Sequence, residues 1–121
     1  LMMQPKEIAL RAAKVLDDRK GLGIKLLQVT DITSLADYFL ICTGTSSTHV
    51  KTLCDSVEQL VSDELGEKLL HREGHRGGTW VLLDFGSLVV HVFTNETRQF
   101  YDLERLWSDA VSVPISFEEK E

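Results

Sequence analysis

The sequence predicts an α/β domain, in which helices flank a mixed β-sheet in the order α-β-β-α-β-β-β-α. Apolar residues at helical spacing alternate with short apolar runs of β-like character, and glycines separate these segments. The chain has 121 residues, of which 43% are hydrophobic and 26% charged, as expected for one globular domain. We predict that residues 1–112 form this domain and that residues 113–121 form an acidic, poorly ordered tail.

The first half of the chain predicts a helix and two strands. The helix spans Pro5 to Arg19, because its apolar residues fall on one stripe and proline suits its first turn. Residues 24–30 and 38–43 form two β-like runs. The second run is apolar on both faces, which indicates a strand in the middle of the sheet.

The segment Gly44 to Ser47 connects the second strand to the strongest helical pattern of the chain. The apolar stripe of this helix runs from Val50 to Leu65, and Gly66 fits its end. A helix N-terminus can hold a phosphate, but this segment lacks the lysine and the spacing of a phosphate-binding loop. We therefore expect Ser46 or Ser47 to cap the helix.

The second half predicts a short strand, a hairpin and a final helix. Residues 68–71 are expected to form the strand, and the polar residues 72–78 a flexible segment. Trp80 to Phe93 then forms two strands joined at Gly86-Ser87. The apolar stripe of the final helix consists of Phe100, Leu103, Leu106, Trp107 and Ala110.

A two-residue turn at Gly86 and Ser87 determines which side chains share a face of the hairpin, because side chains alternate along a strand. The core face consists of Val81, Leu83, Phe85, Leu88, Val90 and Val92. The other face, called the mixed face below, consists of Trp80, Leu82, Asp84, Val89, His91 and Phe93. A three-residue turn would scramble this division, so the clean separation favours the two-residue turn.

The mixed face has two main interpretations. A helix can cover it and satisfy the acid and the histidine internally. Alternatively it binds a protein, because aromatic residues with a few polar anchors are typical of interfaces. The residues alone leave these two equally open. Catalysis by Asp84 and His91 is disfavoured, because no serine or cysteine is placed beside them as a nucleophile.

Composition narrows the classes of ligand. The net charge of −6 argues against general nucleic-acid binding and fits a basic protein partner. The four histidines and two cysteines lack the spacing of a metal site, so neither a metal nor a cofactor is expected. Cys42 and Cys54 are predicted to be buried free thiols in a reducing compartment. Without a membrane span or signal peptide, the protein is expected in the cytoplasm.

Three segments together resemble the ribosomal silencing factor family (RsfS, also called Iojap). They are DYFLICTGTS at 37–46, WVLLDFGSLVVHVF at 80–93 and RQFYDLERLW at 98–107. Their order and spacing agree with the family from about Ile8 to Ala110, so the resemblance is specific.

The resemblance implies a nucleotidyltransferase-like fold and a bacterial, non-enzymatic repressor of translation. Family members bind the large ribosomal subunit through its fourteenth ribosomal protein and block joining of the small subunit when nutrients are short. Several members are homodimers alone, and a homodimer could use the same aromatic face. Organelle relatives assist large-subunit assembly, which is the alternative function.

The family pattern also implies which residues bind the partner, with Trp80 and Phe93 as apolar anchors. With Leu82 and Val89 added from the mixed face, the predicted set consists of Trp80, Leu82, Asp84, Phe85, Val89, His91, Phe93 and Tyr101. The family often has tyrosine at position 85, and Phe85 falls on the predicted core face, so its contact would require reach at the hairpin tip. A metal-dependent nucleotidyltransferase is the weaker alternative, because the lone Asp84 cannot hold two metal ions.

Overall fold

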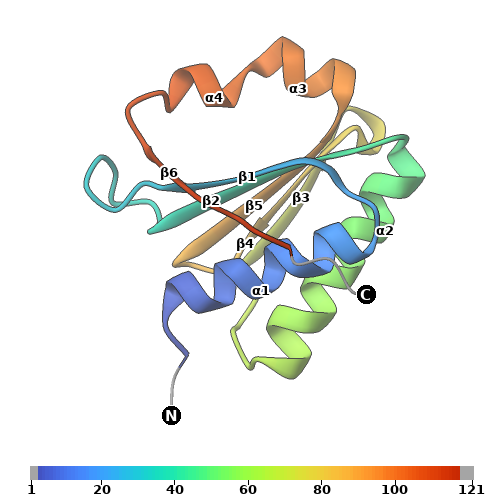
Figure 1. Cartoon of the computed structure of the whole chain (residues 1–121). Coiled ribbons are helices and arrows are strands. Elements are labelled where there is room, and N and C mark those ends of the chain that lie inside the picture. The colour runs from blue at the N-terminus through green and yellow to red at the C-terminus, as the bar shows by residue number, and fades with distance from the viewer. Residues whose placement is uncertain (1–2, 118–121) are drawn as a thin grey trace.

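The computed structural model describes residues 3–117 and shows a six-stranded mixed sheet with helices on both faces (Figure 1). The helices are α1 (Pro5–Asp18), α2 (Ser47–Glu58), α3 (Asn95–Tyr101) and α4 (Leu103–Leu106). A π-helical segment, η1 (Gln59–Glu64), continues α2, and a 3-10 turn, η2 (Arg76–Gly78), precedes the hairpin. The strands are β1 (Leu22–Gln28), β2 (Tyr38–Gly44), β3 (His71–His75), β4 (Trp80–Asp84), β5 (Leu88–Thr94) and β6 (Val111–Val113). The predicted fold class is therefore confirmed.

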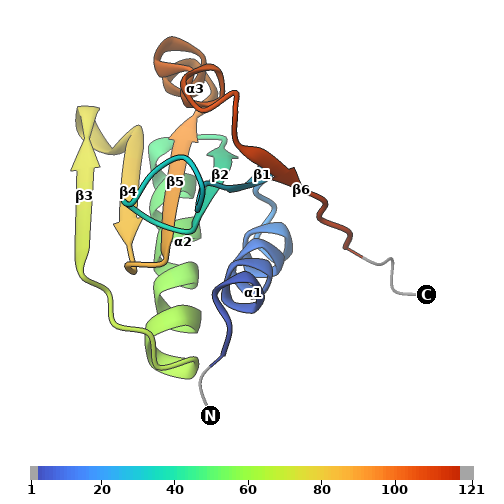
Figure 2. The ribbon, with the colours of Figure 1, turned by 90° about the vertical axis from the view of Figure 1, so that its left-hand side faces the viewer.

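The strands lie in the order β3-β4-β5-β2-β1-β6, with β3 and β6 at the two edges (Figure 2). Strands β2 and β5 are parallel, and the other neighbours are antiparallel. Every residue of β2 is buried, as expected for a strand in the middle of a sheet covered on both faces. The sheet therefore has a core on each side.

The larger core lies between the sheet and helices α1 and α2 (Figure 1). Leu16 and Leu53 from these helices are fully buried there together with Leu40 and Leu83 from the sheet. The smaller core lies on the opposite face, beneath α3 and α4, and is centred on Phe39, Ile41 and Phe93. Aliphatic packing thus dominates one side, and aromatic packing is concentrated on the other.

The predicted cap at the start of α2 is confirmed. The hydroxyl of Ser46 accepts the backbone N–H of His49 at 3.1 Å. The His49 ring accepts the Thr45 N–H through Nδ1 at 2.9 Å and donates from Nε2 to the Arg19 carbonyl at 3.0 Å. These internal partners occupy the N–H groups of Thr45 and His49, and His49 ties the end of α1 to the start of α2.

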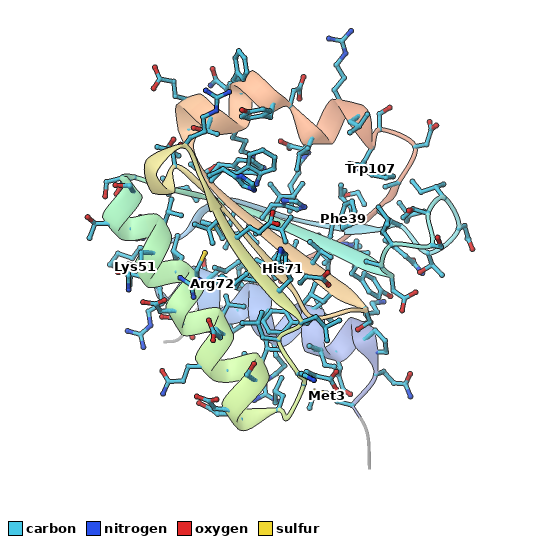
Figure 3. All side chains as sticks on the ribbon, turned by 180° about the vertical axis from the view of Figure 1, so that it is seen from behind. Met3, Phe39, Lys51, His71, Arg72 and Trp107 are labelled. Atoms are coloured by element: carbon cyan, nitrogen blue, oxygen red, sulfur yellow. The ribbon has the colours of Figure 1, made fainter. Side chains whose placement is uncertain are left out.

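Two predictions about the second half of the chain are wrong: the bounds of the strand expected at 68–71, and the flexibility of residues 72–78. The strand expected at 68–71 is β3, which begins at His71 and includes most of the segment expected to be flexible. Arg72 orders it through ion pairs with Asp55 at 2.9 Å and Glu58 at 2.7 Å on α2 (Figure 3). Polar composition suggested a loop, but this is an edge strand, where charged side chains are expected.

The C-terminal segment contains a strand that the sequence analysis did not predict. Residues of β6 pair with β1, and Val113, placed in the tail from sequence, is buried. Ile115 and Phe117 also pack against the larger core. The remaining tail residues, 118–121, lie outside the described residues. Three residues of strand are too short to produce a recognisable pattern in sequence.

The final helix is broken, and its predicted apolar stripe is wrong in part. Asp102 adopts a left-handed conformation, with φ of +49°, and separates α3 from α4. Leu103 and Trp107 pack on the smaller core, but Phe100 is 76% exposed and Leu106 70% exposed. Among residues 3–117, no helix combines the length and apolar character needed to cross a membrane.

Replacing Gly21 with alanine should destabilise the fold. An added Cβ would lie 2.5 Å from Cys42 Sγ and 2.9 Å from the Leu16 carbonyl oxygen, which is part of the backbone. We expect Gly21→Ala to lower the free energy of unfolding by about 2 kcal/mol through overpacking. Gly74→Ala is the control, because its Cβ would meet no atom within 4 Å. Urea denaturation measures both, and equal stability of the two variants would contradict this expectation.

Candidate functional site

The β4–β5 hairpin has the predicted turn and register. Phe85 N–H donates to the Leu88 carbonyl at 2.8 Å across the two-residue turn, and Trp80 pairs with Phe93. Gly86 has φ of +90°, which only glycine adopts easily. All six side chains of the predicted core face are buried in the larger core. The division into a core face and a mixed face is therefore confirmed.

Burial divides the mixed face into two halves. On β5, Val89, His91 and Phe93 are buried, because α3 and α4 lie over this strand (Figure 1). On β4, Trp80, Leu82 and Asp84 are partly exposed. The interpretation that a helix covers the face holds for β5, and the β4 half remains accessible.

Two residues expected to contact a partner are inaccessible. Phe93, predicted as an apolar anchor, is 0% exposed and stacks on Trp80 at 5.2 Å between ring centroids. Phe85 is buried in the larger core and does not reach out at the hairpin tip. Phe93 is covered by α3, whose packing the sequence does not indicate, and Phe85 follows the core face that the turn dictates instead of the family pattern.

Trp80 is held in place by its neighbours. Its indole Nε1 donates to His91 Nδ1 at 3.3 Å, and its ring packs against Tyr101 at 4.7 Å and His75 at 5.0 Å between centroids. The Tyr101 hydroxyl accepts from Arg76 Nε at 2.8 Å. The Trp80 side chain therefore packs between the hairpin and α3, and the His91 ring accepts its indole N–H.

Asp84 and His91 are each engaged separately. Asp84 Oδ1 accepts the Gly86 N–H at 2.8 Å and so stabilises the turn. His91 accepts from Trp80 through Nδ1, which requires the neutral ring. Burial lowers the pKa of His91 to about 4, which keeps the ring neutral. This geometry suits support of the hairpin rather than proton transfer between the two residues.

A groove of about 290 Å³ opens on the mixed face between the hairpin and α4. Its lining is mainly apolar and consists of Leu35, Phe39, Leu82, Asp84, Val89, His91, Leu103 and Trp107. Phe39 and Trp107 pack edge to face at 5.1 Å, beneath α4 (Figure 3). Asp84 supplies the carboxylate of this lining. Leu35, also part of the lining, is 70% exposed.

The groove unites four of the residues predicted from sequence, namely Leu82, Asp84, Val89 and His91. The other half of its lining was missed. Phe39 lies beside Val89 because β2 and β5 are parallel neighbours, and Trp107 reaches it from the end of α4. Leu35 lies in the connection between β1 and β2, where an apolar residue is the one local signal in the sequence.

The comparisons with known proteins agree with this architecture. The family model described as "Ribosomal silencing factor during starvation" matches residues 3–121. The chain belongs to the ribosomal silencing factor family. The ribosomal silencing factor of Bacillus subtilis is 38% identical over 115 residues, covering 95% of this chain and 97% of the relative.

A solved structure and a mitochondrial protein are also similar to this chain. A crystal structure of a Chromobacterium violaceum protein superposes with a TM-score of 0.82 at 38% identity, covering 98% of this chain and 95% of that one. The mouse protein named "Mitochondrial assembly of ribosomal large subunit protein 1" is 32% identical over 87 residues, covering 70% of this chain and 38% of that protein.

Replacing His91 with glutamine should reduce the loss of stability in acid. The folded pKa of about 4 lies below the ordinary value of 6.5, so the unfolded chain binds the proton more readily. The stabilisation is complete above pH 6.5 and declines as the pH falls toward 4, by on the order of 3 kcal/mol. Glutamine can still accept from Trp80 but does not titrate. Urea denaturation across this range should show a shallower decline for His91→Gln, and parallel curves would contradict the assignment.

Proposed function

We propose that this protein binds the large ribosomal subunit through its fourteenth ribosomal protein and thereby prevents joining of the small subunit. Translation would fall as a result when nutrients are limiting. Membership of the ribosomal silencing factor family supports this function. The observation on which the docking assignment depends is the groove on the mixed face, with its apolar floor and single carboxylate.

The proposed mechanism is steric. Apolar side chains at the groove, chiefly Leu35 and Leu82, would lose their contact with water when a partner docks, which favours association. Asp84 and the net charge of −6 complement a basic ribosomal protein and increase the rate of encounter. The remaining body of the domain would then occupy space that the small subunit requires.

We also propose that the protein is not an enzyme. The acid and the histidine of the mixed face both form hydrogen bonds within the hairpin, Asp84 with Gly86 and His91 with Trp80. A carboxylate that fixes a turn and a ring held neutral by burial support a binding surface better than they support acid–base chemistry.

Large-subunit assembly is the second candidate function. It is favoured by the similarity to the mouse protein whose name refers to assembly of the mitochondrial large subunit. Both functions would use the same surface. Ribosomal particles from a deletion strain distinguish them, because immature precursors indicate assembly and excess joined ribosomes in starvation indicate silencing.

Adding positive charge at the groove should weaken docking strongly. Leu35 is 70% exposed, so Leu35→Arg should fold normally, while its guanidinium would repel a basic partner. We expect an affinity for purified large subunits at least about 30-fold lower, as for loss of an interfacial hot spot. The matched control is Leu106→Arg on α4, which is also 70% exposed but lies outside the groove. Co-sedimentation measures both, and equal binding would show that the groove is not the docking site.

Nucleotides should leave the melting temperature unchanged. A ligand that binds the folded state raises this temperature, so a nucleotidyltransferase would respond to a nucleoside triphosphate with Mg²⁺. We expect no saturable shift with any of the four triphosphates. Stabilisation that saturates and requires both the metal and the nucleotide would instead support the enzyme alternative.

A further inference from the structure

Helix α4 forms one wall of the groove but has little structure of its own. It contains four residues, including Leu103, and Trp107 follows at its C-terminal end. A helix of this length is not stable alone, because forming its first hydrogen bond requires ordering several residues at once. Its position therefore depends on side-chain contacts with the rest of the protein.

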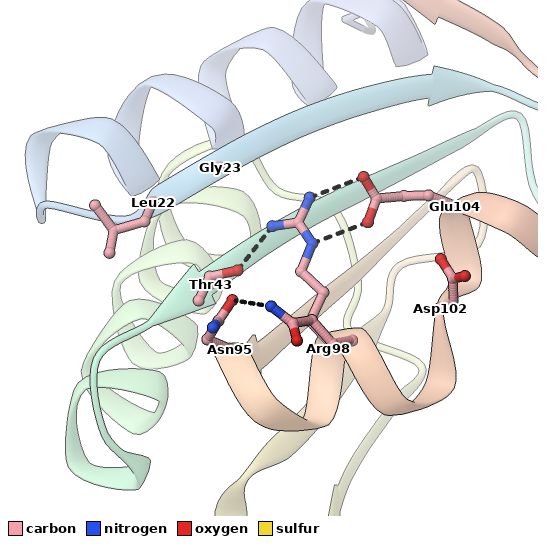
Figure 4. Close-up of a pocket in the computed structure, with 8 residues that line it drawn as sticks. Leu22, Gly23, Thr43, Asn95, Arg98, Asp102 and Glu104 are labelled. Atoms are coloured by element: carbon pink, nitrogen blue, oxygen red, sulfur yellow. Dashed lines mark hydrogen bonds and ion pairs between the residues drawn. The ribbon is translucent and has the colours of Figure 1, made fainter.

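An ion pair spans the break between α3 and α4. Arg98 of α3 donates from Nε to Glu104 Oε1 at 3.0 Å and from Nη2 to Glu104 Oε2 at 3.2 Å (Figure 4). Residues six positions apart lie on different faces of a continuous helix. The two side chains meet because the left-handed Asp102 redirects the chain between them. The ion pair therefore depends on the angle between the two helices.

The same guanidinium is attached to the sheet. Arg98 Nη1 donates to the hydroxyl of Thr43, a buried residue of β2, at 2.7 Å (Figure 4). Lys25 of β1 lies 3.5 Å from the Glu104 carboxylate. The Arg98 side chain is only 12% exposed. Its planar fork thus joins α3, α4 and β2 in one arrangement, which a lysine could not reproduce.

Gly23 provides the space for this arrangement. It has φ of +54°, and the register between β1 and β2 shifts around it. A Cβ at this position would lie 2.9 Å from Arg98 Nη1. The end of a free arginine could move away, but this one is fixed by Thr43 and Glu104. An alanine here would therefore disturb these hydrogen bonds.

We propose that Arg98 is a positioning residue for docking, because it fixes α4 and with it the Leu103–Trp107 wall of the groove. Arg98, Glu104, Thr43 and Gly23 are called the Arg98 clamp below. The effect of Arg98 on binding rests on the proposed function. The placement of α4 can be measured without a ribosome.

The first measurement follows Trp107. The chain has two tryptophans, so Trp80→Phe leaves Trp107 as the single fluorophore. In this background, Glu104→Gln keeps the shape of the side chain but removes its charge. We expect a higher acrylamide quenching constant and a red shift of the emission, since Trp107 would lose its fixed packing against Phe39.

Two glycine variants separate the clamp from backbone strain. Gly23→Ala and Gly66→Ala both place alanine at positive φ, +54° and +74° respectively. No atom lies within 4 Å of the Cβ that alanine would add at Gly66, whereas the one added at Gly23 crowds the guanidinium. Gly23→Ala should therefore raise Trp107 quenching, and Gly66→Ala should leave it unchanged at a similar loss of melting temperature.

The second measurement is the affinity for purified large subunits, with Trp80 retained. Glu104→Gln and Gly23→Ala should weaken binding roughly tenfold, the size expected when a distant residue disturbs a site. Gly66→Ala should bind as the wild type does.

Unchanged quenching in both clamp variants would overturn the assignment of Arg98, whatever the binding data show. Increased quenching with unchanged affinity would overturn its role in docking. If the wild type itself did not bind large subunits, the proposed function and the docking part of this inference would fail together. The quenching result would still decide whether the clamp positions α4.

Discussion

The two-residue turn at Gly86 and Ser87 is the constraint on which the rest of the structure depends. It sets the register of β4 against β5, and the register determines which side chains meet the larger core and which form the mixed face. A slip of one residue would turn one of the two strands over, so that Asp84 of β4 or His91 of β5 would face the leucines and valines of the larger core. The energetic penalty for burying those polar groups makes the observed register the stable one.

The mixed face is wider than the hairpin because β5 also pairs with β2. Their parallel register places Phe39 beside Val89, so the mixed face extends beyond the hairpin to a second strand. Helices α3 and α4 then close one side of this wider face and leave the groove on the other. The groove therefore combines segments that are distant in sequence, and no single motif describes it.

What the sequence predicts well is local. Alternation along Trp80 to Phe93 fixed the two faces, and the Ser46 cap followed from the chemistry of helix starts. What it missed depends on contacts between distant elements. Arg72 orders β3 through acids on α2, and β6 exists because β1 offers a free edge. Phe93 looked accessible because α3 covers its strand, and no local pattern indicates where this helix packs.

Different interactions stabilise the helices on the two faces of the sheet. Helices α1 and α2 bury aliphatic side chains completely, whereas every residue of α3 and α4 is at least partly exposed. Directional contacts supplement the apolar packing of the smaller core on this side, through Arg98 with Glu104 and Arg76 with Tyr101. Hydrogen bonds and ion pairs contribute little net stability, but they require one geometry. A layer held in this way can present a preformed groove while the stability of the fold comes from the opposite face.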